Sequence, residues 1–387
     1  MRILHLITRL DGGGSAVNTL LSATAQQRAG HAVCLAHGPG AESAMTEVEQ
    51  AQLDERLARF REAGGRLRLV PHLKRAPGMH DFMAWREVVR LVAEGFDIVH
   101  THTSKAGAVG RLAAWGRARA VVHTPHGHIF HGYFGPLKTR LFLAIERWLA
   151  RRADALVALT RAEREDSLRL GVGSPEQWRV IPSGVDVRAV ARAVDAWRAS
   201  LGDRDADEWD AVSVDRLVPV KGMDRLLRAW ARLCEKRSRG KESREREPGA
   251  RLAIVGEGEE RQALERLARE LGIAEAVHFA GWRDPSPYLA AARCFALFSR
   301  NEGMGRAAVE ALAAGLPCVV ADVCGLAEVV TPDCGAVVDA DDAEAAADAL
   351  LAWMGRDAAR AARARAEAFS LETMNAALEA LYAELAG

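Results

Sequence analysis

Apolar runs of strand length alternate with amphipathic segments of helix length along the whole chain. In the first half, the predicted strands are residues 3–7, 32–36, 67–70, 97–100, 120–124 and 155–159. The pattern restarts in the second half, where the predicted strands are residues 211–214, 252–255, 277–279, 294–298, 318–321 and 336–338. Alternation of this kind is typical of the α/β class with doubly wound parallel sheets.

A short polar and acidic stretch, residues 201–208, separates the two halves of this pattern. Because a chain of 387 residues exceeds the usual size of one domain, we expect two Rossmann-like domains facing a cleft. The predicted domains are residues 1–204 and 205–369, followed by a last helix over residues 370–387. Ligands of such sheets bind beyond the carboxyl ends of the strands.

Charge is distributed unevenly, although the formal net charge is zero. Residues 1–190 hold 26 Lys and Arg against 18 Asp and Glu, a net +8, and the remainder carries −8. This is either chance surface variation or a basic domain that faces an anionic acceptor or lipid surface. The mixed run over residues 236–249 reads as a solvated loop, and nucleic acid is not an expected partner.

Cysteine spacing and hydropathy predict the compartment. The six cysteines include no CxxC pair, which favours reduced residues in a cytoplasmic protein. No apolar run approaches the roughly 18 residues that span a bilayer, so we expect any membrane contact to be peripheral, at the inner face of the cell membrane.

Two acids flank a glycine-rich helix start in the second half. Glu302 and Glu310 lie on either side of Gly303-Met304-Gly305, directly after an apolar strand. Glycines there let a ligand approach backbone N–H groups at the positive end of a helix. The pattern indicates a nucleotide-sugar site, with the diphosphate at the helix start and the carboxylates near sugar hydroxyls.

Other loops after predicted strands carry cations or glycines. Arg216 and Lys221 share one loop and are candidates to neutralise a departing diphosphate, or are two exposed surface cations. Gly13 and Gly14 open a helix and either approach a phosphate or form a tight turn. Gly256 and Gly258 follow another predicted strand, and they either line a nucleotide pocket or form a plain turn.

Histidines gather after the strand over residues 120–124. A metal site is an alternative there, but no HExxH helix or carboxylate set accompanies His123, His126, His128 and His131, so no metal is expected. The preferred interpretation is that His126 contacts the transferred sugar. Ser104 and Lys105 open a helix and are candidate acceptor contacts. The acidic run over residues 339–342 could be a metal-binding motif, but capping of the helix that follows explains it better.

Together these motifs resemble the GT-B glycosyltransferases of family 4, the retaining "group 1" transferases, over nearly the whole chain. The stretches that carry the resemblance are residues 12–14, 126–127, 183–186, 216–222, 256–258, 279–282, 302–311 and 328–330. Residues 100–107 also resemble a subgroup that builds bacterial surface polysaccharides.

The resemblance implies a role for each matching residue. Glu310 would bind the ribose, and Glu302 with residues 303–305 would hold the sugar and diphosphate of a UDP- or GDP-sugar, which is a substrate rather than a cofactor. Arg216 and Lys221 would stabilise the leaving diphosphate, and His126 would contact the sugar. The last helix would cross back to the N-terminal domain.

The reaction expected from these roles is transfer to a glycan or lipid-linked acceptor, with retention and without a metal. The resemblance implies retention, and the lack of a clear general base on the N-terminal side fits retention better than inversion, although Asp11 would restore an inverting mechanism if it reached the acceptor hydroxyl. The alternatives are a GT-B nucleotide-sugar epimerase or hydrolase and a non-catalytic nucleotide-sugar-binding protein. The presence of all four charged site residues argues against a non-catalytic binding protein. These residues are Arg216, Lys221, Glu302 and Glu310.

Overall fold

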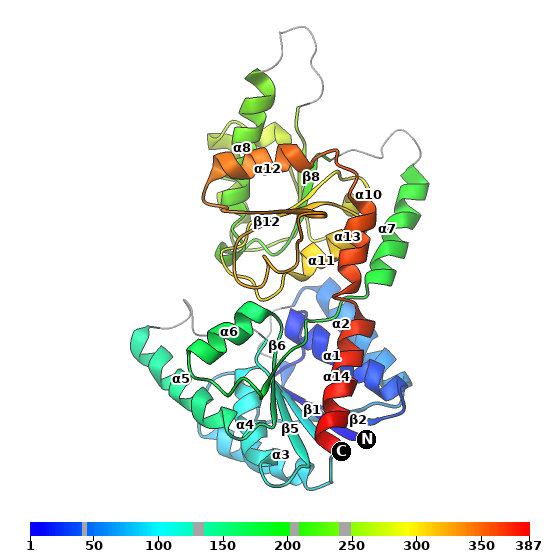
Figure 1. The fold of residues 1–387 in the computed structure, drawn as a ribbon, viewed down its shortest axis with the longest axis vertical. Helices are drawn as coiled ribbons and strands as arrows, with labels where there is room; N and C mark the ends of the chain where they lie inside the picture. The colour runs from blue at the N-terminus through cyan, green and yellow to red at the C-terminus, as the bar shows by residue number, and fades with distance from the viewer. Residues whose placement is uncertain (41–44, 127–134, 202–208, 240–248) are drawn as a thin grey trace. The chain divides into compact units, whose positions relative to one another are not determined.

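The computed structural model forms two compact units, each built on its own parallel sheet (Figure 1). The first unit comprises residues 1–184 and 371–387, and the second comprises residues 185–370. The structure describes residues 1–40, 45–126, 135–201, 209–239 and 249–387.

The first unit has a seven-stranded sheet in the order β3-β2-β1-β4-β5-β6-β7. Its strands are β1 (Arg2–Ile7), β2 (Ala32–His37), β3 (Arg66–Leu69), β4 (Ile98–His102), β5 (Ala120–Thr124), β6 (Ala155–Ala158) and β7 (Trp178–Val180). Its helices are α1 (Gly14–Arg28), α2 (Glu47–Glu62), α3 (His80–Val92), α4 (Ser104–Ala114), α5 (Pro136–Ala150), α6 (Arg161–Arg169) and α14 (Leu371–Ala386). The chain order reverses between β1 and β4, which makes this pair the switch point of the sheet.

Helices cover both faces of this sheet, as the alternation of side chains along β1 requires. Ile3 and Ile7 pack with residues of α1, α2 and α14, whereas Leu4 and Leu6 pack with α3 and α4. Successive side chains of a strand point to opposite faces, so a parallel strand covered on both sides is apolar at every position. His5 breaks this run on the face of Ile3 and Ile7, fully buried.

The second unit has a six-stranded sheet in the order β10-β9-β8-β11-β12-β13, with its switch point between β8 and β11. Its strands are β8 (Ala211–Val214), β9 (Leu252–Val255), β10 (Val277–Gly281), β11 (Phe295–Leu297), β12 (Cys318–Ala321) and β13 (Gly335–Val338). Its helices are α7 (Val187–Leu201), α8 (Met223–Arg239), α9 (Arg261–Glu270), α10 (Ser286–Ala290), α11 (Arg306–Ala313), α12 (Ala343–Trp353) and α13 (Ala359–Glu367), with short 3₁₀ turns η3 (Pro219–Lys221) and η4 (Ala274–Ala276).

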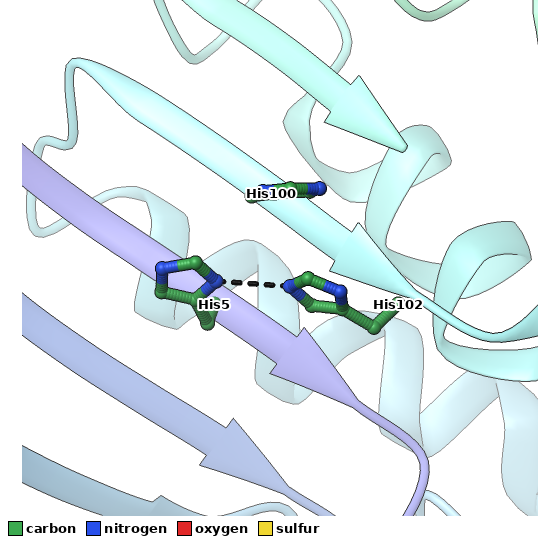
Figure 2. Close-up of side chains that lie close together, drawn as sticks. All are labelled: His5, His100 and His102. Carbon is green, nitrogen blue, oxygen red and sulfur yellow. Dashed lines mark hydrogen bonds between the residues drawn. The ribbon is translucent and has the colours of Figure 1, made fainter. Parts of the chain in front are cut away.

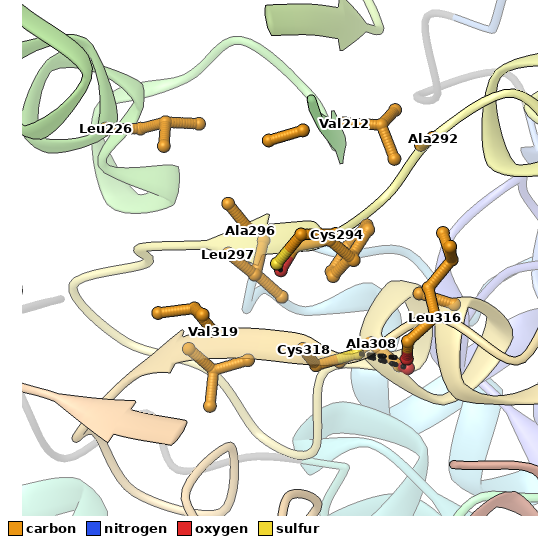
Figure 3. Close-up of a cluster of buried hydrophobic side chains, with 14 of the residues drawn as sticks. Val212, Leu226, Ala292, Cys294, Ala296, Leu297, Ala308, Leu316, Cys318 and Val319 are labelled. Atoms are coloured by element: carbon orange, nitrogen blue, oxygen red, sulfur yellow. Dashed lines mark hydrogen bonds between the residues drawn. The ribbon is translucent and has the colours of Figure 1, made fainter. Parts of the chain in front are cut away.

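The core of the second unit combines small and aliphatic side chains with the buried aromatic residues Trp230, Phe295 and Phe298. Figure 3 shows Val212 of β8, Leu226 of α8 and Val319 of β12 near Cys294, which directly precedes β11, and Cys318 of β12. Cys294 and Cys318 are fully buried and unpaired, and burial raises the pKa of both thiols, Cys294 to about 12. They therefore pack as small apolar residues.

All twelve predicted strands are present, and the predicted α/β class is confirmed. The sequence analysis missed β7, a three-residue edge strand with too few apolar positions to stand out. It also ended β4 at His100, whereas the strand continues to His102. That extension is Thr101 and His102, which are buried with hydrogen-bond partners on other elements: Thr101 bonds to His123, and His102 bonds to His5 and His126.

The compact units divide at residues 184/185 and 370/371, whereas the sequence predicts a division near residue 205. The difference is α7, which belongs to the second unit. Its Arg198 donates to the carbonyls of Ala290 and Ala314 at 3.3 and 2.8 Å, and its Asp195 pairs with Arg363. The polar stretch over residues 202–208, which lies outside the described residues, thus joins two elements of one unit.

Candidate active site

The loops that follow β8 and β11 bring three charged side chains together at the switch point of the second sheet. Lys221 Nζ lies 2.8 Å from Asp215 Oδ2 and 2.6 Å from Glu302 Oε2. Ser299 Oγ donates to the same Glu302 oxygen at 3.3 Å. All three charged side chains are mostly buried, with 12–16% of their surface exposed. The site therefore holds a desolvated ammonium between two carboxylates.

Electrostatics keep the lysine protonated. Burial opposes its charge, but Asp215 and Glu302 outweigh that effect and raise the pKa of Lys221. Burial raises the pKa of Asp215 despite the nearby ammonium, and Glu302 adds to that rise. A pair of carboxylates around one cation carries a surplus of negative charge, so the cluster would gain from a further cation or from a ligand that donates hydrogen bonds.

A second set of contacts fixes the two loops to each other. Arg300 donates through both terminal nitrogens to Asp224, at 2.7 and 2.6 Å, and to the carbonyl of Pro219 at 2.9 Å. Its backbone N–H donates to Val220 at 2.8 Å. Two parallel hydrogen bonds from one guanidinium to one carboxylate fix the positions of both side chains, and here they fix the loop after β11 against the loop after β8. The position of Lys221 against Glu302 is thereby fixed from outside the cluster.

Arg216 lies in the same loop but stays exposed. Its backbone N–H donates to Asp215 Oδ1 at 2.8 Å, which orients the acid rather than the guanidinium. The side chain is free to turn toward a ligand, and its role as a diphosphate contact stays a prediction.

The turn before α11 provides room for a ligand at Gly303. A Cβ on Gly303 would meet nothing within 4 Å, and Gly305 adopts φ +79°, a conformation that favours glycine. Met304 is buried, so only its backbone can face a ligand. The predicted approach of a diphosphate to this helix start has open space at Gly303.

Gly256 and Gly258, predicted to bind the donor, have another reason to be glycine. A Cβ on Gly256 would lie 1.8 Å from the Asp215 carbonyl oxygen, and one on Gly258 would lie 2.2 Å from that of Leu217. The missing side chains allow two backbone segments to touch. Their contact with a donor stays a prediction.

Glu310 lies one turn along α11, 3.9 Å from Arg306 Nη2. Burial lowers the pKa of Arg306, and Glu310 partly restores it. The arginine was not among the predicted site residues. It adds a cation at the helix start, where a diphosphate is expected.

In the first unit, the predicted acceptor residues are engaged with protein groups. Asp11 pairs with Arg9 at 2.6 Å and accepts from the Gly13 N–H at 2.9 Å. That amide is therefore used within the loop, whereas Gly14 is exposed at the start of α1. Lys105 pairs with Asp81 and donates to the Ala76 carbonyl at 3.2 Å, and Ser104 is the first residue of α4.

His126 lies two residues after β5 and joins a group of buried histidines at the switch point of the first sheet. His5, His100 and His102 each place a ring nitrogen within 4.8 Å of the others, a set that could hold a metal ion among the described residues (Figure 2). Every ring nitrogen of the three is hydrogen-bonded instead, to His, Gln, Tyr or Thr. The metal alternative considered for the histidine run falls largely on His128 and His131, outside the described residues.

The acidic run before α12 is a helix cap, as predicted. Asp342 Oδ1 accepts from the backbone N–H groups of Glu344 and Ala345 at 3.1 and 3.0 Å. Its carboxylate thus satisfies the first turn of α12.

Sequence comparison decides the family. The model of "Glycosyl transferases group 1" matches residues 195–369, and the model of a "Glycosyl transferase 4-like domain" matches residues 13–184. A D-inositol 3-phosphate glycosyltransferase of Saccharomonospora viridis is 34% identical over 319 residues, 75% of this chain and 70% of the relative. The chain belongs to the group 1 glycosyltransferases.

Other relatives of this glycosyltransferase carry different acceptor names. A UDP-Gal:α-D-GlcNAc-diphosphoundecaprenol α-1,3-galactosyltransferase of Escherichia coli is 31% identical over 61% of this chain and 60% of its own. A lipopolysaccharide core biosynthesis glycosyltransferase of Rhizobium meliloti is 36% identical over 44% of each chain.

Solved structures confirm the GT-B fold of this glycosyltransferase. Anabaena HepE in complex with UDP matches with a TM-score of 0.78 over 99% of this chain and 100% of its own, at 22% identity. WaaG, a glycosyltransferase of lipopolysaccharide biosynthesis, matches with a TM-score of 0.68 over 100% of both chains, at 20% identity.

The sequence analysis of the glycosyltransferase missed Asp215, which directly follows β8 in the loop of Lys221. A carboxylate at the carboxyl end of a central strand is a usable signal, and the neighbouring cations drew attention away from it. It also missed His5, His102 and Gln26, whose contact with one another depends on strand pairing and has no local signal.

We expect Gly256→Ala to destabilise the second unit by about 2–4 kcal/mol, because it forces a strained φ of +148° and a contact with the Asp215 carbonyl. Urea unfolding followed by fluorescence measures the loss. Gly303→Ala is the matched control, since its Cβ enters open space and should change stability by less than about 1 kcal/mol. Equal stability of the two variants would contradict the packing role of Gly256.

Proposed function

We propose that this glycosyltransferase moves a sugar from a nucleoside-diphosphate donor, a UDP- or GDP-sugar, to a glycan or lipid-linked acceptor, with retention and without a metal. The observation that carries the proposal is the position of Lys221 between Asp215 and Glu302, beside the open glycine turn of α11. Departure of a nucleoside diphosphate develops negative charge, and a buried ammonium with a helix start stabilises such charge where it forms.

The donor contacts follow from this arrangement. Glu302 and the backbone of residues 303–305 hold the sugar and diphosphate, and Glu310 binds the ribose. Arg216 turns from solvent onto the diphosphate, and Arg306 adds charge at the same helix start. The Anabaena relative in complex with UDP supports a uridine donor, though at an identity that establishes only the fold.

The acceptor proposal rests on relatives. The Escherichia coli relative is named for a diphosphoundecaprenol-linked sugar, and the Rhizobium meliloti relative for lipopolysaccharide core biosynthesis. The first name specifies a sugar linked to diphosphoundecaprenol, and the second specifies the core of a lipopolysaccharide. A lipid-linked or cell-surface glycan precursor is therefore the acceptor class we propose for this chain, with Ser104 and Lys105 as candidate contacts.

Retention is favoured by the state of Asp11. Its oxygens already accept from Arg9 and from the Gly13 N–H, and these contacts hold the loop before α1. A carboxylate used in this way is less available as the base that inversion needs. NMR of the product anomer tests the proposal, and an inverted anomeric centre would overturn it.

We expect a UDP- or GDP-sugar to raise the melting temperature by several degrees at saturating concentration, because a ligand of the folded state stabilises it by mass action. A thermal-shift screen across UDP-, GDP- and ADP-sugars measures this. Glu310→Gln should reduce the shift for the same donor, because the charged carboxylate with two acceptor oxygens becomes a neutral amide with only one. No shift with any donor would count against the proposed function.

Product analysis then separates transfer from the alternatives. With the donor that shifts melting and a lipid extract, transfer gives a glycosylated lipid and free nucleoside diphosphate. A hydrolase gives free sugar without the extract, and an epimerase gives a new nucleotide sugar. The reaction should proceed in the presence of EDTA, and loss of activity restored by a divalent cation would overturn the metal-free proposal.

Helix α5 supports a peripheral membrane contact. It exposes a stripe of apolar side chains, Leu137, Leu141, Ile145 and Trp148, named here the α5 stripe, with 39–81% of each residue exposed. Arg152, just beyond the helix, stacks over Trp148 at 3.5 Å and over the exposed Trp115 at 4.4 Å. Apolar side chains with flanking cations and tryptophans suit an anionic lipid surface. Among the described residues, no helix is long and apolar enough to cross a membrane.

We expect the double variant Leu141→Glu/Ile145→Glu to bind anionic vesicles at least about tenfold more weakly, because two apolar side chains leave the lipid and two negative charges replace them. Vesicle co-sedimentation measures the affinity. Leu69→Glu is the control, since Leu69 is also exposed but lies on the edge strand β3. Equal loss in both proteins would exclude the α5 stripe as the contact.

A further inference from the structure

An unbroken line of hydrogen-bonded side chains runs from the interior of the first unit to His126. His5 Nε2 lies 2.7 Å from Gln26 Oε1, and His5 Nδ1 lies 2.9 Å from His102 Nε2. His102 Nδ1 lies 3.0 Å from His126 Nε2. Figure 2 shows the central link, from His5 on β1 to His102 at the end of β4. The line crosses the switch point between β1 and β4.

The line has a direction. A neutral imidazole has one N–H and one bare nitrogen, so each ring in such a line donates on one side and accepts on the other. The Gln26 carbonyl oxygen can only accept, which places the proton of His5 on Nε2. His102 must then donate through Nε2 to His5 Nδ1, and His126 must donate through Nε2 to His102 Nδ1. This leaves His126 Nδ1 without a proton.

Burial keeps the rings neutral. It lowers the pKa of His5 and of His126 to about 4, and lowers that of His102 well below its usual value. The titratable neighbours packed against the line are His100, His123 and Tyr382. The two histidines are also held neutral by burial, and burial raises the pKa of Tyr382, so none supplies a charge near neutral pH.

The backbone is held in uncommon conformations where the line reaches the end of the sheet. His126 adopts φ +60° and Thr103, next to His102, adopts φ +66°, a region that non-glycine residues rarely occupy. Thr103 is fixed by hydrogen bonds of its Oγ1 to Thr8 and to the His102 carbonyl. Backbone strain of this kind is found most often at active sites and ligand-binding sites. His126 Nδ1 has no partner within the described part of the chain.

We infer that Gln26, His5 and His102 are positioning residues that fix His126 as the Nε2–H tautomer, so that its bare Nδ1 accepts a hydrogen bond from a hydroxyl of the bound sugar. The kinetic part of this inference rests on the proposed function, and the tautomer does not. His126 then acts as an acceptor, neither a cation nor a donor. A donor sugar that lacks the hydroxyl group facing His126 Nδ1 should gain nothing from this positioning of His126.

A metal held by His5, His100 and His102 is the competing use of the same side chains. It would break the link from His5 to His102, and it would take from His100 one of its two hydrogen bonds, to Tyr382 Oη at 2.5 Å or to Thr124 Oγ1 at 2.7 Å. A metal site needs His100 as a ligand, whereas the hydrogen-bonded line does not include it. The ring centroid of His100 nevertheless lies 4.2 Å from that of His102. His100→Phe is therefore the matched control for His102→Phe.

Nitrogen-15 NMR of the full chain tests the tautomer directly. We expect the His126 resonances to show a protonated Nε2 and a bare Nδ1 between about pH 6 and 8. In His102→Phe the preference should disappear, whereas in His100→Phe it should persist. A protonated Nδ1 on His126 in the unmodified protein would overturn the inference, whether or not the chain turns over a donor.

Kinetics with the donor from the thermal-shift screen give the second readout. We expect His102→Phe to lower kcat about tenfold, with a change in donor KM of less than about threefold. His102→Gln keeps one donor and one acceptor and should recover most of the loss. His100→Phe should retain kcat. A drop of equal size in both Phe variants, together with stoichiometric zinc in the unmodified protein, would replace the line by a metal site.

If His102→Phe fails to fold, Gln26→Met provides the same test from the other end of the line, because it removes the acceptor that sets the direction. It should mix the tautomers of His126 and lower kcat in the same sense. Unchanged tautomer and kcat in Gln26→Met would overturn the inference. Absence of transfer in the unmodified protein, with the predicted tautomer present, would instead refute the proposed function alone.

Discussion

Lys221→Ala is expected to lower kcat for sugar transfer by about 10²- to 10³-fold, because the departing diphosphate loses a preorganised cation in a desolvated site. The ammonium is held between Asp215 and Glu302 before any ligand arrives, so the unmodified protein needs little reorganisation as charge develops. Donor affinity should fall less than kcat if the contact strengthens in the transition state. Initial rates over a range of donor concentrations measure both parameters.

The variant leaves two carboxylates close together without their cation, so folding must be checked beside activity. Lys221→Met fills more of the volume and should give the same loss of kcat. Lys236→Ala is the control: that lysine of α8 pairs with Glu344 and Asp348 of α12, outside the cluster of Lys221, and its variant should retain full activity. Donor turnover that survives Lys221→Ala in a folded protein would remove Lys221 from the chemistry.

The sequence predicts the second unit's site well because its parts are local. Lys221, Glu302 and the glycine turn all lie within a few residues of a strand end, and parallel strands bring their carboxyl ends to one edge of the sheet. What it does not predict is the partner of each charge. The pairs of Lys221 with Glu302 and of Arg300 with Asp224 become visible only when β8 and β11 lie side by side.

The first unit shows the opposite case. His5, His102 and Gln26 come from β1, β4 and α1, and their spacing along the chain carries no signal of contact. His102 was placed outside its strand because a run of His and Thr reads as polar. The end of the strand is buried with tertiary partners, since His102 bonds to His5 and Thr101 bonds to His123, and this tertiary effect overrides the local pattern.

Glycines illustrate the limit of motif reading. The same residue type opens space for a ligand at Gly303 and lets two backbone segments touch at Gly256. A sequence shows both as glycine after a strand. The surroundings of the missing side chain, rather than the motif, separate the two uses.

Acidification from pH 7.5 to 5 is expected to unfold the first unit well before the second. Burial lowers the pKa of six histidines in the first unit: His37, and the five of the buried group, His5, His100, His102, His123 and His126. The unfolded chain therefore binds more protons than the folded unit below the unfolded pKa of about 6.5. The contribution of the neutral histidines to the free energy of unfolding is fully present above that value, and it is lost as the pH falls from about 6.5 toward 4.

The size of this effect follows from the number of histidines. Each contributes up to roughly 1.4 kcal/mol per pH unit over the window, so five of them at half that value lose about 5 kcal/mol by pH 5. That is comparable with the whole stability of a domain. In the second unit, burial raises the pKa of Asp215, which has the opposite sign: the folded state binds the extra proton, so acidification to pH 5 does not destabilise the unit through this group.

Hydrogen exchange followed by mass spectrometry measures the two units separately in one sample, with rates corrected for the intrinsic effect of pH. Peptides from β1 and β4 should lose protection between about pH 6.5 and 5, whereas peptides from β8 and β11 should keep it. His100→Phe removes one of the five groups and should lessen the dependence of the first unit's stability on pH. Simultaneous loss of protection in both units would contradict the assignment of acid sensitivity to the buried histidines.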